Sequence, residues 1–114
     1  MKFSKPFTDL EKIQLLQRSI LVNSFAYYEL NDNLLSDFQY DANAAQLIQL
    51  MRDQPDISKQ SRYHKYFHDY CPSTDDAHYT SGFDLIVRLE KDKKMYKIIS
   101  HDTHLALKLK KERT

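Results

Sequence analysis

The strongest constraint on the fold is a long stretch of helical periodicity near the start of the chain. In residues 8–30, apolar side chains recur every three or four positions, which places them on one face of an α-helix. Thr8 and Glu11 have the spacing of a capping box, and Asp9 suits the positive end of a helix dipole. Residues 31–33, Asn-Asp-Asn, end the pattern because their side chains compete for backbone hydrogen bonds.

A second periodic segment follows after a short link. Ser36 and Gln39 again have capping-box spacing, and an apolar stripe continues from Tyr40 to Met51. The helix is expected to end near Asp53, because the residue before Pro55 is disfavoured in a helix. Since the link is short, the two helices are predicted to form an antiparallel hairpin.

The second half of the chain is less regular. A short helix is predicted over residues 58–70, stopped by Pro72 and followed by a polar loop. Residues 83–100 fit either a β-hairpin or an apolar segment leading into a helix over 92–112. The helix is favoured because Asp-Lys-Lys lacks the Gly or Asn of tight hairpins. The predicted fold is mainly α: a helical hairpin plus one or two further helices, with a short β-hairpin in the last third left open.

Composition narrows the classes of function. At 114 residues, one domain spanning 1–114 is expected. Seventeen basic against sixteen acidic side chains give a net charge of +1, so nucleic acid is not indicated as the primary target. Gly82 is the only glycine, which excludes glycine-rich phosphate loops. The single cysteine, the charged N-terminus and the lack of a long apolar run predict a soluble, cytoplasmic protein.

Five residues around the predicted hairpin turn form the main candidate site. Tyr27 and Tyr28 end the first helix, while Asp37, Tyr40 and Asp41 share one face at the start of the second. In a hairpin these two helix ends lie side by side. Tyrosine faces attract planar cations, and carboxylates accept hydrogen bonds from hydroxyl or amide groups. The same residues also suit packing and capping, so both interpretations stay open from spacing alone.

Three weaker patterns have mainly structural explanations. His64 and His68 have the i, i+4 spacing of a zinc pair, but no further ligand is fixed by the sequence, so surface or half-buried histidines are favoured. His101 and His104 form a second loose pair. Cys71 is interpreted as a small buried hydrophobe. The basic C-terminal end suits a solvated helix terminus, with an auxiliary nucleic-acid contact as its alternative; its basic residues are Lys108, Lys110, Lys111 and Arg113.

The stretch Tyr27-Tyr28 followed by "NDNLLSDFQYDA" resembles the N-terminal NMN-binding domain, domain Ia, of bacterial NAD-dependent DNA ligases. The resemblance covers residues 10–53, leaving 54–114 as a family-specific extension. "SRYHKYFHDY…TSGFDL" also looks like small stand-alone ligase-domain relatives associated with phage genomes. Departures lie in the turn, where Asn31, Asn33 and Leu34 replace an Asp, a Pro and a Glu, which implies a looser turn.

The resemblance implies that Tyr27, Tyr28, Asp37, Tyr40 and Asp41 hold NMN or NAD, by stacking and by contacts to the ribose or carboxamide. The adenylation motif Lys-x-Asp-Gly is absent, because the only glycine follows a serine. The expected function is therefore non-catalytic: a module that binds NMN or NAD, or acts in trans on a ligase, and requires no cofactor.

The alternative expectation is a small phage-type interaction module that acts in the host cytoplasm. It would inhibit a host enzyme, such as a defence nuclease in the manner of an anti-CRISPR protein, or an NAD-consuming enzyme. A third expectation, hydrolysis of NMN by the chain itself, would need Asp37 and Asp41 to serve as an acid–base pair.

Overall fold

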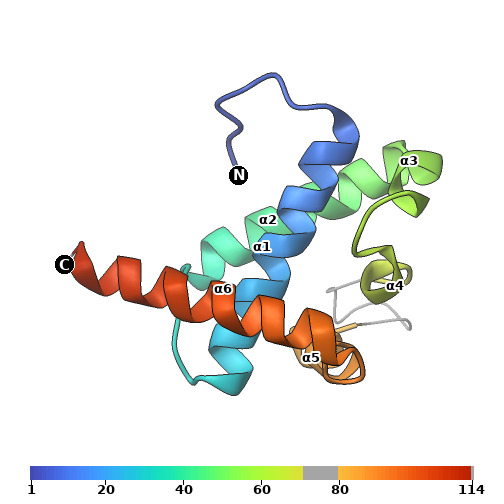
Figure 1. Cartoon of the computed structure of the whole chain (residues 1–114). Coiled ribbons are helices and arrows are strands. Elements are labelled where there is room, and N and C mark those ends of the chain that lie inside the picture. The colour runs from blue at the N-terminus through green and yellow to red at the C-terminus, as the bar shows by residue number, and fades with distance from the viewer. Residues whose placement is uncertain (71–79, 114) are drawn as a thin grey trace.

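The computed structural model describes residues 1–70 and 80–113, and every regular element in these ranges is an α-helix (Figure 1). The prediction of a mainly α fold is therefore confirmed. The helices of the described residues are α1 (Asp9–Glu29), α2 (Asp37–Asp53), α3 (Pro55–Lys59), α4 (His64–Phe67), α5 (Gly82–Glu90) and α6 (Lys93–Glu112).

Helix α1 is the central element, because α2, α3, α5 and α6 pack against it, while α4 packs against α5. Of these helices, α6 crosses α1 in Figure 1. The predicted boundaries and capping box are confirmed: the Glu11 amide donates to Thr8 Oγ1 over 3.2 Å, and the Thr8 amide donates to Glu11 Oε1 over 3.0 Å. The apolar stripe becomes the core. Its fully buried members on this helix include Ile13, Leu16, Ile20, Leu21 and Phe25.

Helix α2 begins after Ser36 and ends at Asp53, as predicted, and returns across α1 at a slant (Figure 1). Ser36 Oγ accepts a hydrogen bond from the Gln39 amide over 3.1 Å. The reciprocal half of the expected capping box is not formed, because the Gln39 side chain donates to Asn43 Oδ1 instead. The Gln39 side chain therefore makes a hydrogen bond to the next turn of α2 and does not cap the helix.

The single helix predicted over residues 58–70 is wrong, because the chain forms α3 and α4 with a turn between them. Side chains of α1 hold this turn. Gln17 Nε2 donates to Ser61 Oγ over 3.1 Å, and the Arg62 amide donates to Gln14 Oε1 over 2.9 Å. Each of these bonds uses a group at the turn, and their partners lie 44 and 48 residues away. The periodicity of residues 58–70 alone could not predict this turn, because the residues that hold it are distant in sequence.

The last third is helical, so the β-hairpin left open for residues 83–100 is wrong. Helix α5 occupies the segment predicted only as apolar, and it buries the spacing i, i+1, i+4 against α1 through Leu85, Ile86 and Leu89. Such spacing places side chains on one helical face, whereas a strand would divide them between two faces. The predicted helix over 92–112 is confirmed as α6, with Asp92 as its N-cap.

Asp92 also joins α4 to α6. Its Oδ1 accepts from the Met95 amide over 3.2 Å, while Tyr66 Oη donates to its Oδ2 over 2.6 Å and the Lys65 ammonium contacts the same oxygen. These hydrogen bonds, led by that from Lys65, hold the pKa of Asp92 well below its usual range. Burial, together with the bond to the Asp92 carboxylate, raises the pKa of the Tyr66 hydroxyl.

Two sequence predictions fall wholly or mostly outside the described part of the chain: Cys71 as a buried hydrophobe, and the polar loop predicted over residues 72–82, whose described end is one residue too long because Gly82 already begins α5. In the ranges that are described, none of the helices combines the length and the apolar character that a bilayer crossing would require.

The buried amide of Gln17 offers a test of the core. Its side chain is fully buried, and its Oε1 has no hydrogen-bond partner among the described residues. Gln17→Met should raise the free energy of unfolding by up to about 1 kcal/mol, because removing the unsatisfied buried acceptor at similar volume outweighs the loss of the Gln17 Nε2–Ser61 Oγ hydrogen bond. Urea denaturation measures this change. Ser61→Ala is the control and should lower stability, since Ser61 Oγ donates to Ser58 O over 2.6 Å; a loss of stability in Gln17→Met would contradict the prediction.

Candidate ligand-binding cavity

A cavity of about 220 Å³ lies where the C-terminal end of α1 meets the start of α2 and the N-terminal end of α5. Four separate stretches of sequence contribute to its wall, and most of the lining side chains are polar or aromatic. The described residues that line it are Asn23, Ser24, Tyr27, Tyr28, Asn33, Leu34, Leu35, Asp37, Tyr40, Tyr70, Ser81 and Gly82. Its walls combine ring surfaces with hydrogen-bonding groups, as small-molecule sites do.

Four of the five predicted site residues line this cavity: Tyr27, Tyr28, Asp37 and Tyr40. Asp41 is exposed on α2 and does not belong to the described lining. The two adjacent tyrosines are about half exposed, and their rings meet edge to face with centroids 4.8 Å apart. The structure therefore brings the tyrosines and one of the two carboxylates together.

Gly82 is the point where α5 approaches the tyrosines most closely. A Cβ at this position would lie 2.9 Å from Ser24 Oγ, 3.0 Å from Tyr28 Cε2 and 3.0 Å from Tyr40 Oη. The Tyr40 hydroxyl is itself fixed by a hydrogen bond of 2.9 Å with Ser24 Oγ. The only glycine of the chain is thus required by close packing and not by an unusual backbone angle, because no positive φ is recorded for it.

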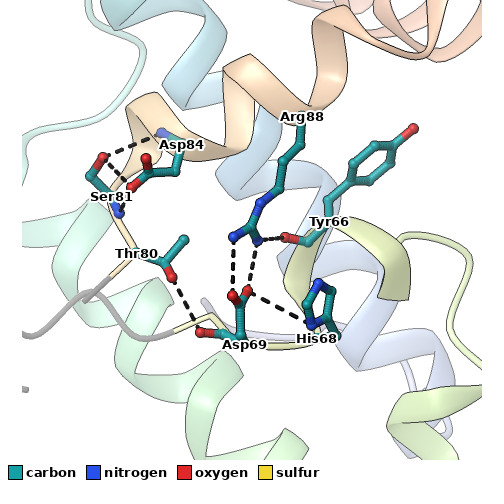
Figure 2. A network of polar contacts seen from close by, with 7 residues as sticks. All are labelled: Tyr66, His68, Asp69, Thr80, Ser81, Asp84 and Arg88. Carbon is teal, nitrogen blue, oxygen red and sulfur yellow. Dashed lines mark hydrogen bonds and ion pairs between the residues drawn. The ribbon is translucent and has the colours of Figure 1, made fainter. Parts of the chain in front are cut away.

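A network of polar contacts holds the loop ends that supply this wall (Figure 2). Arg88 of α5 binds Asp69 through two parallel hydrogen bonds of 2.7 and 3.1 Å, and it also donates to Tyr66 O over 2.8 Å. Thr80 Oγ1 donates to Asp69 O over 3.2 Å. Since Tyr70 and the start of α5 flank these residues, the network fixes both parts of the wall.

Helix α5 carries its own N-terminal capping box (Figure 2). The Ser81 amide donates to Asp84 Oδ2 over 2.7 Å and its hydroxyl donates to the same oxygen over 2.9 Å, while the Asp84 amide donates to Ser81 Oγ over 3.3 Å. The carboxylate therefore occupies donors at the positive end of this helix dipole, next to Ser81 and Gly82 of the cavity wall.

The turn between α1 and α2 is held by backbone contacts. Asn31 has φ of 50°, the left-handed conformation that Asn adopts more readily than most residues. The amides of Leu30 and Asp32 both donate to Ala26 O, over 3.2 and 2.9 Å. The Lys110 ammonium of α6 contacts the carbonyl of Asn33. This turn, which the resemblance implies to be loose, is thus tied to both α1 and α6.

The sequence interpretation missed two kinds of lining residue. Ser24 and Asn23 lie within the periodic part of α1 and have no local signature. Tyr70, Ser81 and Gly82 come from the second half of the chain, and only the uniqueness of Gly82 could have drawn attention to that region. Their contribution depends on how α5 docks against α1.

The weaker candidates do not assemble into a second site. His64 and His68 lie with ring centroids 6.4 Å apart, the first half-buried and the second exposed, and His101 and His104 are exposed. Across the described ranges, no group of three or more His, Cys, Asp and Glu side chains could hold a metal ion. The basic side chains at the end of α6 are solvent-exposed, which agrees with a solvated helix end.

Comparisons with known proteins give no relative for this chain. A scan against protein-family models, a search of curated proteins and a search of solved structures each find no match. Without such a match, the likeness to the ligase domain is supported only by the sequence pattern around the cavity, and the function that it implies is a proposal.

Substituting the glycine tests the packing of the cavity wall. Gly82→Ala should lower the free energy of unfolding by about 1–3 kcal/mol, because the added Cβ overlaps three neighbouring atoms. At an open helix position the same change would be stabilising by up to about 1 kcal/mol. Thermal or urea unfolding measures the difference. Ser24→Ala in the Gly82→Ala background should recover part of the loss, whereas a simple gain in stability would show that the wall is not close-packed.

The ion pair between Asp69 and Arg88 should affect acid stability. The hydrogen bond from Arg88 is the main cause that lowers the pKa of Asp69 in the folded chain. A lowered pKa stabilises the fold above about pH 4, and this contribution is lost as the pH falls through the folded-state value. Asp69→Asn should therefore cost about 0.5–1 kcal/mol near pH 7 and flatten the acid limb of a stability–pH curve. Asp56→Asn, at an exposed carboxylate of α3, is the control and should leave that limb steep.

Proposed function

We propose that this chain is a non-catalytic binding module that holds the nicotinamide and ribose of NMN or NAD in the cavity. The observation that carries the proposal is the composition of the wall, in which Tyr27, Tyr28, Tyr40 and Asp37 converge from α1 and α2. These are four of the residues to which the ligase resemblance assigns ligand contacts. The two lines of reasoning use different premises, and they select the same groups.

The chemistry of the wall suits a nicotinamide nucleoside. A pyridinium ring is planar and positively charged, so it is attracted to tyrosine faces by roughly 0.5–2 kcal/mol for each contact. The Asp37 carboxylate can accept hydrogen bonds from ribose hydroxyls or from the carboxamide. The volume of about 220 Å³ is below the roughly 300–1,000 Å³ of sites for drug-sized ligands, and it suits a nucleoside part better than a whole dinucleotide.

Binding without catalysis is the form of the proposal that the geometry supports. Hydrolysis of the ligand would need an acid and a base that both reach it. Asp37 lines the cavity, but Asp41 lies outside the described lining. The adenylation motif is absent from the sequence. A role in trans, in which the module supplies a nucleotide site to a ligase, remains within the proposal.

A second candidate function is an interaction module that binds and inhibits a host enzyme, such as a defence nuclease or an NAD-consuming enzyme. The observation that favours it is a continuous exposed aromatic surface. Tyr27 meets Tyr28 edge to face, and Tyr28 meets Phe83 in the same way with ring centroids 5.8 Å apart. Val87 lies one helical turn beyond Phe83 and is also exposed. Aromatic surfaces of this kind are enriched at protein interfaces.

Calorimetric titration with NMN and NAD tests the first function. Binding at up to millimolar concentration is expected, and Tyr27→Ala should weaken it about 2- to 30-fold, because one ring contact is lost. Tyr27 is 56% exposed, so its loss should leave the fold intact. Asp41→Asn should change the dissociation constant less than about twofold.

Phe38→Ala is the matched control, since Phe38 is an aromatic of α2 that is 83% exposed and outside the described lining of the cavity. It should leave binding unchanged. If no heat is detected with either nucleotide at millimolar concentration, the first function is rejected. In that case Val87→Asp becomes the useful variant, because it alters the exposed aromatic surface without touching the described cavity wall.

A further inference from the structure

The electrostatic character of the cavity is negative. Asp37 is the one ionic side chain among its described lining residues, and neither Lys, Arg nor His occurs among them. Tyrosine rings add negative potential at their faces. A phosphate group carries one to two negative charges near neutral pH, and it would enter this space without a basic partner among the described residues. A positively charged ring would instead meet the Asp37 carboxylate and the faces of tyrosine rings.

The charges at the helix ends around the cavity also disfavour an anion. The C-terminal end of α1 carries the negative end of its dipole, and its last turn contains no basic residue. The N-terminal ends of α2 and α5 are positive, but each has a carboxylate of its own. Asp37 lies in the first turn of α2, and Asp84 accepts two hydrogen bonds from Ser81 on α5 (Figure 2). The positive end of α5 is therefore compensated by Asp84, while the start of α2 places the carboxylate of Asp37 in the cavity lining.

The Lys110 ammonium makes a contact with the cavity wall. It contacts the carbonyl of Asn33, a residue of the wall, and Lys110 itself does not belong to the described lining. This contact holds the turn between α1 and α2 from outside. It thus uses the cation to support the wall and does not place it inside the cavity.

We propose that the cavity selects a cationic nucleoside over its 5′-phosphate, so that nicotinamide riboside binds more tightly than NMN. This inference rests on the proposed function, because it concerns the same cavity and the same ring–ribose ligand. It goes further by identifying charge as the basis of selection. The ring and ribose occupy the wall of tyrosines, and any phosphate stays in solvent at the opening.

The test compares three probes by calorimetry at low ionic strength: nicotinamide riboside, NMN, and nicotinic acid riboside, whose ring bears a carboxylate. Nicotinamide riboside should bind about 3- to 10-fold more tightly than either of the others, which is the size expected for one or two charge repulsions at partly solvated separations. Raising the salt concentration should reduce this ratio, because screening weakens the repulsion between partly exposed charges.

Two variants connect the preference to particular groups. Asp37→Asn removes the carboxylate while keeping the size of the side chain, and the ratio of nicotinamide riboside to NMN affinity should fall toward one. Lys110→Gln should leave the ratio unchanged if the phosphate stays away from this ammonium. Circular dichroism of both variants checks that α2 and α6 are intact, so that a changed ratio reflects charge.

The outcomes separate the inference from the function on which it rests. If NMN binds as tightly as nicotinamide riboside, or more tightly, and Tyr27→Ala weakens both, the charge selection is wrong while the binding function stands. If Lys110→Gln selectively weakens NMN, the phosphate uses that cation, and the inference is again overturned. If none of the probes binds, the proposed function fails together with the inference.

Discussion

The close approach of α5 to α1 at Gly82 is the contact on which the candidate site depends. With hydrogen in place of a side chain, the first turn of α5 can lie against Ser24 and the rings of Tyr28 and Tyr40. The hydrogen bond between Tyr40 and Ser24 joins α2 to α1 at the same point. Helices α1, α2 and α5 therefore contact one another at this point, and the cavity lies beside it. Protein interiors are close-packed, so such a junction tolerates little added volume.

The carboxylates around this junction have two roles: some hold the wall in place, and one gives the cavity a negative charge. Asp69 and Asp84 are satisfied by Arg88 and by the N-terminal end of α5, respectively, so these carboxylates position the wall. Asp37 is different, because it lines the cavity in the first turn of α2. Asp84 and Asp37 both lie in the first turn of a helix, where a carboxylate is favoured by the helix dipole. They differ in their surroundings, because Asp84 accepts hydrogen bonds from Ser81 whereas Asp37 lines the cavity.

The sequence predicted the parts of the fold whose causes are local. The capping box of Thr8 and the long apolar stripe define α1, and Ser36 together with the break before Pro55 defines α2. It failed over residues 58–70, because side chains of α1 that lie more than 40 residues away hold the intervening turn. It was ambiguous over 83–100, which begins with an apolar run too short to distinguish a helix from a strand. Four site residues were found from spacing around one turn, but Gly82 and Tyr70 were missed because their place depends on the docking of α5.

The position of Tyr70, Ser81 and Gly82 in the cavity wall bears on the division of the chain into residues 10–53 and 54–114. The resemblance to the ligase domain covers residues 10–53, yet the cavity wall also includes Tyr70, Ser81 and Gly82 from the remainder. The helical hairpin alone would leave the faces of Tyr28 and Tyr40 without the helix end that packs on them. A ligand in the cavity would contact α1, α2 and α5 together, and it would bind only the folded arrangement of all three. By linkage, such a ligand stabilises the whole chain in proportion to its occupancy. The segment 54–114 is therefore part of the candidate site, and the unit that could bind is the whole fold.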